Sequence, residues 1–253
     1  MTKSDQNEEQ DINELLASYA ADVTQFIAST STLKKLTEMG LKLDKPLEET
    51  ADSYIHRIFE ERKKVAKEVI GSMPTRPNIP LPPILSLYDE IGECILFGLN
   101  GAAISLSAVL IEFAIKHAIV DHKKGTELYD KAEWNRVEKK ELGPIIGEAE
   151  ELGLFDEEDI KKLIHFKNTI RNPYLHYNIK EITKDVIMQE AFAYNAETNK
   201  VEKKYNLRAE DNPFLWELGK RKVDEGEVLE VFKFADSVVR ALFPASSFKP
   251  NYN

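Results

Sequence analysis

The spacing of apolar residues predicts a chain built mainly from helices. Apolar positions recur every three to four residues over 12–39, 47–70, 84–99, 102–123, 142–152, 156–170 and 228–243, as expected where each helix buries one face. Asp156 suits a helix N-cap, with Glu158 and Asp159 in the first turn. Two short runs, 191–194 and 201–205, flank a polar turn and predict a β-hairpin. The pattern therefore indicates an all-α fold with a small hairpin near 191–205.

A proline-rich segment divides this pattern. Residues 73–83 contain five prolines, which fix φ and remove backbone donors, so the segment should be extended and stiff. We therefore predict an N-terminal helical extension (1–72), a connector (73–83) and a helical domain (84–245). We also expect protease to cut the connector first.

The overall charge argues against indiscriminate binding to nucleic acid. The net charge is −10 and the pI is about 5.2, whereas such binding needs a broad basic surface. The stretch from Lys161 to Lys184 is the exception. It contains six cationic residues, five lysines and Arg171, but only one carboxylate, Glu181, so its formal charge is six minus one, or +5. A solvated helix face is one interpretation of this stretch, and a local anion site is the other.

Several classes of protein are disfavoured. The polar, acidic start is unlike a signal peptide, and the most apolar stretch, 102–120, contains Glu112 and Lys116. We therefore expect a cytoplasmic protein in which this stretch is a buried helix and not a membrane span. The single cysteine, Cys94, allows no internal disulfide and no Cys–His zinc spacing, and there is no glycine-rich phosphate loop. We expect neither a metal site nor a cofactor.

The segment from Arg171 to His176 is the strongest candidate for chemistry. Asn172-Pro173 suits an N-cap followed by the first residue of a new helix. Asn172 and His176 would then share one helix face, with Arg171 beside the free backbone N–H groups of the helix start. A phosphate could meet all three residues there. The structural alternative is a capped helix, a surface histidine and an Arg–carboxylate ion pair.

Three further residues extend this candidate site. Glu112 lies in an apolar helix, where it could bond to a neighbouring helix or orient a catalytic side chain. Lys167 and Lys180 belong to the basic stretch and are candidates for substrate contacts. Catalysis is assigned to Arg171, Asn172 and His176, with Glu112 in a supporting role.

These residues resemble the HEPN family (higher eukaryotes and prokaryotes nucleotide-binding), whose motif is Arg, four to six residues, His, with a polar residue after the Arg. LYDEIGECILFGLNGAAISLSAVLIEFAIKHAI resembles the family's paired core helices, and EAEELGLFDEEDIKKLIHFKNTIRN resembles the helix leading into the motif. The resemblance covers roughly residues 83–243.

The resemblance implies a HEPN-like helical bundle that dimerises and brings two motifs into one cleft. It further implies a metal-independent endoribonuclease, with His176 as acid or base, Arg171 stabilising charge on phosphorus and Asn172 positioning the phosphate or His176. A toxin or defence role, with an antitoxin or regulatory protein as partner, belongs to the same expectation. Two alternatives stay open: a non-catalytic module that binds nucleotide or RNA, and a helical dimerisation or scaffold protein.

Overall fold

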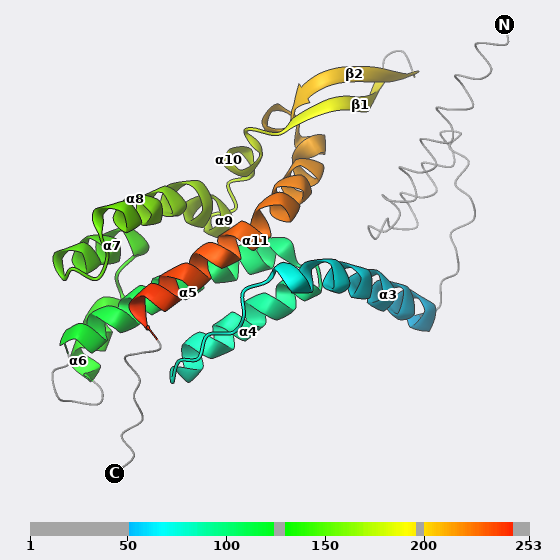
Figure 1. Cartoon of the computed structure of the whole chain (residues 1–253). Coiled ribbons are helices and arrows are strands. Elements are labelled where there is room, and N and C mark those ends of the chain that lie inside the picture. The colour runs from blue at the N-terminus through cyan, green and yellow to red at the C-terminus, as the bar shows by residue number, and fades with distance from the viewer. Residues whose placement is uncertain (1–50, 124–129, 196–199, 245–253) are drawn as a thin grey trace, which may run out of the picture. The chain divides into compact units, whose positions relative to one another are not determined.

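The computed structural model describes residues 51–123, 130–195 and 200–244 (Figure 1). Helices account for 78% of these residues and the one sheet among them has two strands, which confirms an all-α fold with a small hairpin. The chain divides into two units, residues 1–59 and 60–253. The helices expected over 12–39 lie outside the described residues, and the division at 73–83 stays a prediction.

The described elements follow one another in a simple order, with short 3₁₀ turns between some of them. The helices are α3 (Ala51–Val69), α4 (Pro82–Leu96), α5 (Asn100–Lys123), α6 (Lys131–Glu138), α7 (Leu142–Glu151), α8 (Glu157–Phe166), α9 (Asn172–Leu175), α10 (Ile179–Thr183) and α11 (Trp216–Leu242). The strands β1 (Ile187–Asn195) and β2 (Lys200–Arg208) pair antiparallel between α10 and α11.

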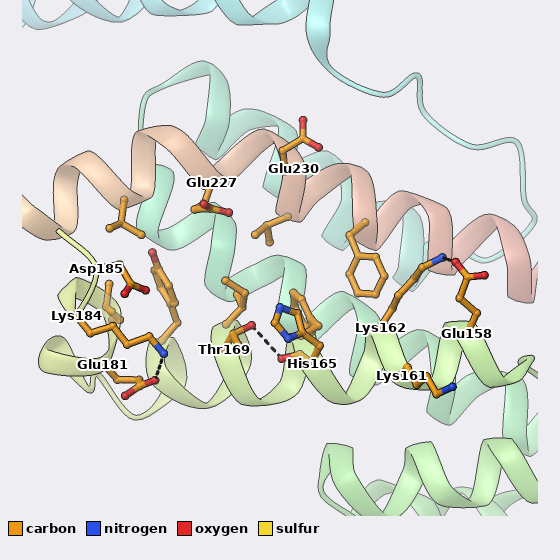
Figure 2. Close-up of a pocket in the computed structure, with 17 residues that line it drawn as sticks. Glu158, Lys161, Lys162, His165, Thr169, Glu181, Lys184, Asp185, Glu227 and Glu230 are labelled. Atoms are coloured by element: carbon orange, nitrogen blue, oxygen red, sulfur yellow. Dashed lines mark hydrogen bonds and ion pairs between the residues drawn. The ribbon is translucent and has the colours of Figure 1, made fainter.

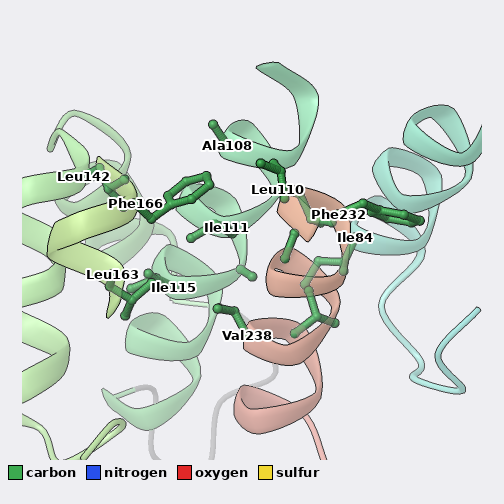
Figure 3. Close-up of a cluster of buried hydrophobic side chains, with 14 of the residues drawn as sticks. Ile84, Ala108, Leu110, Ile111, Ile115, Leu142, Leu163, Phe166, Phe232 and Val238 are labelled. Atoms are coloured by element: carbon green, nitrogen blue, oxygen red, sulfur yellow. The ribbon is translucent and has the colours of Figure 1, made fainter. Parts of the chain in front are cut away.

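Helix α5 is the centre of the second unit (Figure 3). It contacts α4, α6, α7, α9 and α11, and its residues Ala103, Ser107 and Ala108 are fully buried. Small side chains at these positions let neighbouring helices approach closely. By length and composition α5 could cross a membrane, but 67% of its most apolar window is buried against the other helices. The expectation of a buried core helix over 102–120 is confirmed.

Residues 73–81 of the proline-rich segment form no helix, as predicted, but Pro82 and Pro83 open α4, because the first N–H groups of a helix have no partner within it and proline is tolerated there. The segment is also held against the helices. Arg76 donates two hydrogen bonds to Asp89 of α4, at 2.7 and 3.0 Å. The hydroxyl of Tyr88 donates to the carbonyl of Thr75 at 3.2 Å, and Ile79 is buried in the core. Because its backbone is held in this way, we expect the segment to resist protease more than its sequence alone indicates.

Ion pairs join α6 and α7 to the end of α5. Glu148 of α7 is mostly buried and accepts hydrogen bonds from Arg136 at 2.5 Å, from Lys140 at 2.7 Å and from Lys123. The hydrogen bond from Arg136, followed by those from the two lysines, lowers the pKa of Glu148 from 4.5 to about 2. This cluster ties α6 and α7, which are too short to be stable alone, to the end of the long helix α5.

Candidate functional site

The predicted site lies on a single helical run that extends from α8 to α9. Asp156 caps α8 as predicted, because its side chain accepts from the backbone N–H of Asp159 at 2.9 Å. After Phe166 the run continues through a π turn, Lys167–Arg171, and the N–H of Asn172 donates to the carbonyl of Lys167. Helix α9 follows without a break, so a single run positions every residue of the candidate motif.

The prediction that Asn172 caps a new helix is wrong. Asn172 has helical backbone angles (φ −67°, ψ −48°), and its side chain accepts no capping hydrogen bond from the backbone. Proline normally interrupts a helix because it lacks the N–H and its ring clashes with the carbonyl four residues earlier. The π turn shifts the hydrogen bonds just before Pro173, which lets the helix pass through it. The expected anion site of free backbone N–H groups is therefore absent at this position.

His176 lies at the carboxyl end of α9. It is the C-cap residue, and Tyr177 after it has a positive φ of 50°. The N–H of Asn178 donates to the carbonyl of Pro173 at 2.8 Å and that of Tyr177 to Tyr174 at 3.2 Å, which is a Schellman ending. Glycine is usual at the left-handed position, and an exposed tyrosine there is strained. Motif residues thus occupy the end of a helix and not its start.

The side chains of Arg171, Glu112 and Asn172 meet. Nη2 of Arg171 donates to Oε2 of Glu112 at 3.1 Å, and Nη1 donates to Oδ1 of Asn172 at 3.1 Å. The Arg171 side chain is 13% exposed, and its buried Nε has no partner in the described part of the chain. The structure therefore supports the predicted association of Glu112 with the motif, in the form of an ion pair across two helices.

Lys116 completes this cluster, although its role was not predicted. Its Nζ donates to Oε1 of Glu112 at 2.8 Å and to the carbonyl of Glu138 at 3.0 Å. Two cations and one carboxylate give the cluster a net charge of +1. The signal in the sequence was the spacing of Glu112 and Lys116, which are four residues apart in an otherwise apolar helix and so share one face.

His176 is near this cluster along the run, but its side chain makes no hydrogen bond to it among the described residues. Its backbone N–H donates to the carbonyl of Asn172 at 3.1 Å, so the two residues lie one helical turn apart, on one face. The imidazole is exposed and has no hydrogen-bond partner among the described residues. An exposed imidazole beside a cationic cluster can exchange a proton with a bound molecule.

Most of the basic stretch is neutralised by nearby carboxylates. Lys167, half-buried on the π turn, and Lys180, exposed on α10, have no ion-pair partner within the described ranges. Both are therefore available to meet an anion, but no contact joins them to the cluster, and their role in substrate contacts stays a prediction. The pairs that neutralise the remaining cations are Lys161–Glu157, Lys162–Glu158, Lys184–Glu181 and Arg171–Glu112.

The other reactive groups of the described residues give no second chemical site. Among the described residues no three His, Cys, Asp or Glu side chains come together as metal ligands. Burial, and then the charges of Glu90 and Glu93, raise the pKa of the Cys94 thiol, which disfavours a nucleophilic thiolate. The chemistry of this part of the chain therefore rests on its cationic and imidazole groups.

A groove runs beside the candidate site (Figure 2). Its volume is about 800 Å³, and it lies between α11 and the run from α8 to α10. Tyr174 lines it and donates to Oδ1 of Asp224 at 2.6 Å, while Lys220 donates to the other oxygen of that carboxylate at 2.5 Å. Arg171 and His176 do not line the groove. Groove and candidate site therefore use different residues of the same helical run.

No protein-family model matches the chain, and no curated protein or solved structure is significantly similar to it. The assignment of a function thus depends on the chemistry of the residues themselves.

Proposed function

We propose that this chain is a cytoplasmic, metal-independent endoribonuclease of the HEPN type, which acts as a homodimer. The observation that carries the proposal is the cluster in which Glu112 and Asn172 hold the guanidinium of Arg171, with exposed His176 one turn further along the helix. The cluster is cationic although the chain as a whole has a charge of −10. A local positive charge beside a proton-exchanging group suits a phosphodiester.

The reaction needs only these groups and the ribose of the substrate. One His176 removes the proton of a 2′-OH, the 2′ oxygen forms a bond to phosphorus, and the bond from phosphorus to the 5′ oxygen breaks. The leaving oxygen receives a proton from a second imidazole, that of the partner subunit's motif. The products are a 2′,3′-cyclic phosphate and a 5′-hydroxyl. DNA lacks the 2′-OH and is not cleaved.

Arg171 keeps N–H groups that can donate to a phosphate. Nη1 and Nη2 each use one N–H in the bonds to Asn172 and Glu112, and each keeps a second N–H. These donors can meet the extra negative charge that develops on the phosphate oxygens in the transition state. Glu112 and Asn172 hold the guanidinium in place, so little side-chain entropy is lost on binding RNA.

The ion pair between Arg171 and Glu112 also favours a second candidate function. A carboxylate bound to the guanidinium competes with phosphate, and such a pair is what a non-catalytic RNA-binding or scaffold module would contain. In that case His176 is only a surface residue. An antitoxin or regulatory protein as partner, in a toxin or defence role, belongs to the ribonuclease proposal alone.

Cleavage of mixed cellular RNA, with and without EDTA, tests the proposal. We expect wild-type cleavage to survive EDTA and His176→Ala to reduce the rate about a hundredfold or more. His122→Ala, which removes an exposed histidine of α5, is the matched control and should cleave normally. Wild-type protein that binds RNA without cleaving it would support the non-catalytic binding module. Loss of cleavage in both variants would show that the effect is not specific to His176.

A further inference from the structure

The groove between α11 and the run from α8 to α10 has an apolar floor. Phe166 of α8 and Phe234 of α11 meet there, with ring centroids 5.3 Å apart, and Val231 and Ile170 extend the floor along both walls. Phe166 and Val231 are buried in the main core, so the floor is a rigid part of the fold. A preformed apolar floor is what a partner's apolar side chains require.

The shape of the groove fits a helix. On α11 the lining extends from Val223 to Phe234, which at 1.5 Å per residue is about 16 Å, or three turns. Figure 2 shows Glu227 on α11 with His165 and Thr169 on the opposite wall, while Glu230 of α11 points away from that wall. A ligand helix of three to four turns would lie along this groove with its apolar stripe on the floor.

The charges that line the groove favour a positively charged ligand. Asp185 and Glu227 have no ion-pair partner in the described part of the chain, whereas the lining lysines are each paired with a carboxylate. Five lining carboxylates against three lysines leave a net charge of −2, since five minus three is two. The carboxylates are Glu158, Glu181, Asp185, Glu227 and Glu230, and the lysines are Lys161, Lys162 and Lys184.

We propose that this groove binds a basic amphipathic helix of a partner protein. The apolar stripe of that helix contacts Phe166, Val231 and Phe234, and its flanking lysines or arginines pair with Asp185 and Glu227. Such binding is independent of the proposed ribonuclease activity, because the groove uses neither Arg171 nor His176. It can nevertheless influence the candidate site, since Ile170 and Tyr174 of the wall adjoin Arg171 and Pro173 in one helical run.

A designed peptide can serve as the probe. It is a fluorescent, end-capped helix of roughly 14 residues with one leucine stripe flanked by lysines, and its controls are a scrambled sequence and a version with glutamates in place of the lysines. Fluorescence anisotropy with the full chain measures binding. We expect the basic stripe to bind more tightly than both controls, and its affinity to fall as salt is added.

Charge-reversal variants locate the binding. The double variant Asp185→Lys with Glu227→Lys should weaken binding on the order of tenfold, because it replaces two attractions with two repulsions. Glu225→Lys makes one such charge reversal at another exposed position of α11, outside the groove lining, and should leave the affinity unchanged, whereas Glu227→Lys alone should weaken it. All these positions are exposed, so the variants should keep the wild-type thermal midpoint.

Three results would overturn the proposal. The first is an affinity that the double variant leaves unchanged, which would place binding elsewhere. The second is equal or tighter binding of the scrambled or the acidic peptide. The third is no binding at all, as expected if the chain itself or a second copy covers the groove. None of these measurements uses RNA, so they fail or succeed separately from the cleavage assay.

Discussion

Nη2 of Arg171 lies 3.1 Å from Oε2 of Glu112, although the two residues are separated by 59 positions in the sequence. Both side chains are less than one-fifth exposed. At this depth an ion pair is costly to break, because the remaining charge stays partly desolvated. The residue proposed to contact phosphate is thus also a fixed part of the fold, and stability and activity must be measured separately.

The ion pair gives the first prediction. Glu112→Gln should lower the free energy of unfolding by about 2 kcal/mol, since it leaves Arg171 and Lys116 without their shared carboxylate. Glu90→Gln, at an exposed position of α4, is the control and should have no effect. Combining Glu112→Gln with Arg171→Gln should recover about 1 kcal/mol in urea titrations. RNA cleavage should be lost in the double variant, and cleavage at the wild-type rate would rule out a catalytic role for Arg171.

Two glycines of α11 give the second prediction, because their surroundings differ. A Cβ at Gly219 would lie 2.9 Å from the Cβ of Ala209 and 3.2 Å from Cγ2 of Thr183, whereas nothing lies within 4 Å of one at Gly226. Gly219→Ala should therefore destabilise the chain by about 1 to 3 kcal/mol through overpacking. Gly226→Ala should stabilise it by up to about 1 kcal/mol through helix propensity. Equal changes in thermal midpoint would contradict this packing of α11.

The hydrogen bond between Tyr174 and Asp224 gives the third prediction. Tyr174→Phe removes a buried bond to a carboxylate and should cost about 2 kcal/mol of stability, while exposed Tyr177→Phe should cost nothing. Burial, and then this bond, raise the pKa of Tyr174 above its ordinary value of 10.0. Neutral Tyr174 therefore stabilises the fold below about pH 10, and this contribution is lost as the pH rises further. Urea titrations in which both variants match wild type would contradict it.

Glu148 gives the fourth prediction, which concerns acid. Its folded-state pKa of about 2 lies below the ordinary 4.5, so its ion pairs stabilise the fold above about pH 4.5 and are lost as the pH falls toward 2. Glu148→Gln should therefore cost on the order of 2 to 3 kcal/mol near pH 7 and much less near pH 2. Glu151→Gln, at an exposed position of the same helix, is the control. A cost that does not change with pH would show that the cluster is not charged in this way.

The proposed composite site gives the fifth prediction. Light scattering should report a dimer at micromolar concentration, because two motifs must share one cleft for one imidazole to accept a proton and the other to donate one. A monomer that still cleaves RNA would contradict the two-histidine mechanism. A monomer without activity would favour the scaffold or binding interpretation.

Local patterns in the sequence predicted much of the fold. The periodicity of α5 and α7, the N-cap at Asp156 and the small hairpin could be predicted because each depends on neighbouring residues. Helix α11 begins at Trp216, twelve residues before the predicted start at Val228. Its first turns are buried through Gly219 and Asp224, which carry no apolar signal. That burial depends on packing against distant segments, which periodicity does not reveal.

The candidate site was predicted in its residues and less well in its geometry. Glu112, Arg171 and Asn172 do come together, since an acidic residue in an apolar helix needs a partner. Asn172-Pro173 indicated the start of a helix, because that pair usually is one. The π turn that overrides this preference has no simple sequence signature. The groove was not predicted either, because it is formed by helices that are distant in sequence.

The π turn at Lys167–Arg171 determines the direction in which every later side chain of the helical run points. One extra residue in a turn rotates each later side chain by about 100° relative to an uninterrupted helix. The chain can therefore keep Leu163 and Phe166 in the core before the turn and Tyr174 in the core after it, while Arg171 reaches Glu112. An insertion or deletion of one residue in this turn would rotate α9 relative to α8, and would turn Asn172 and His176 to a new direction while it moved Tyr174 out of the core.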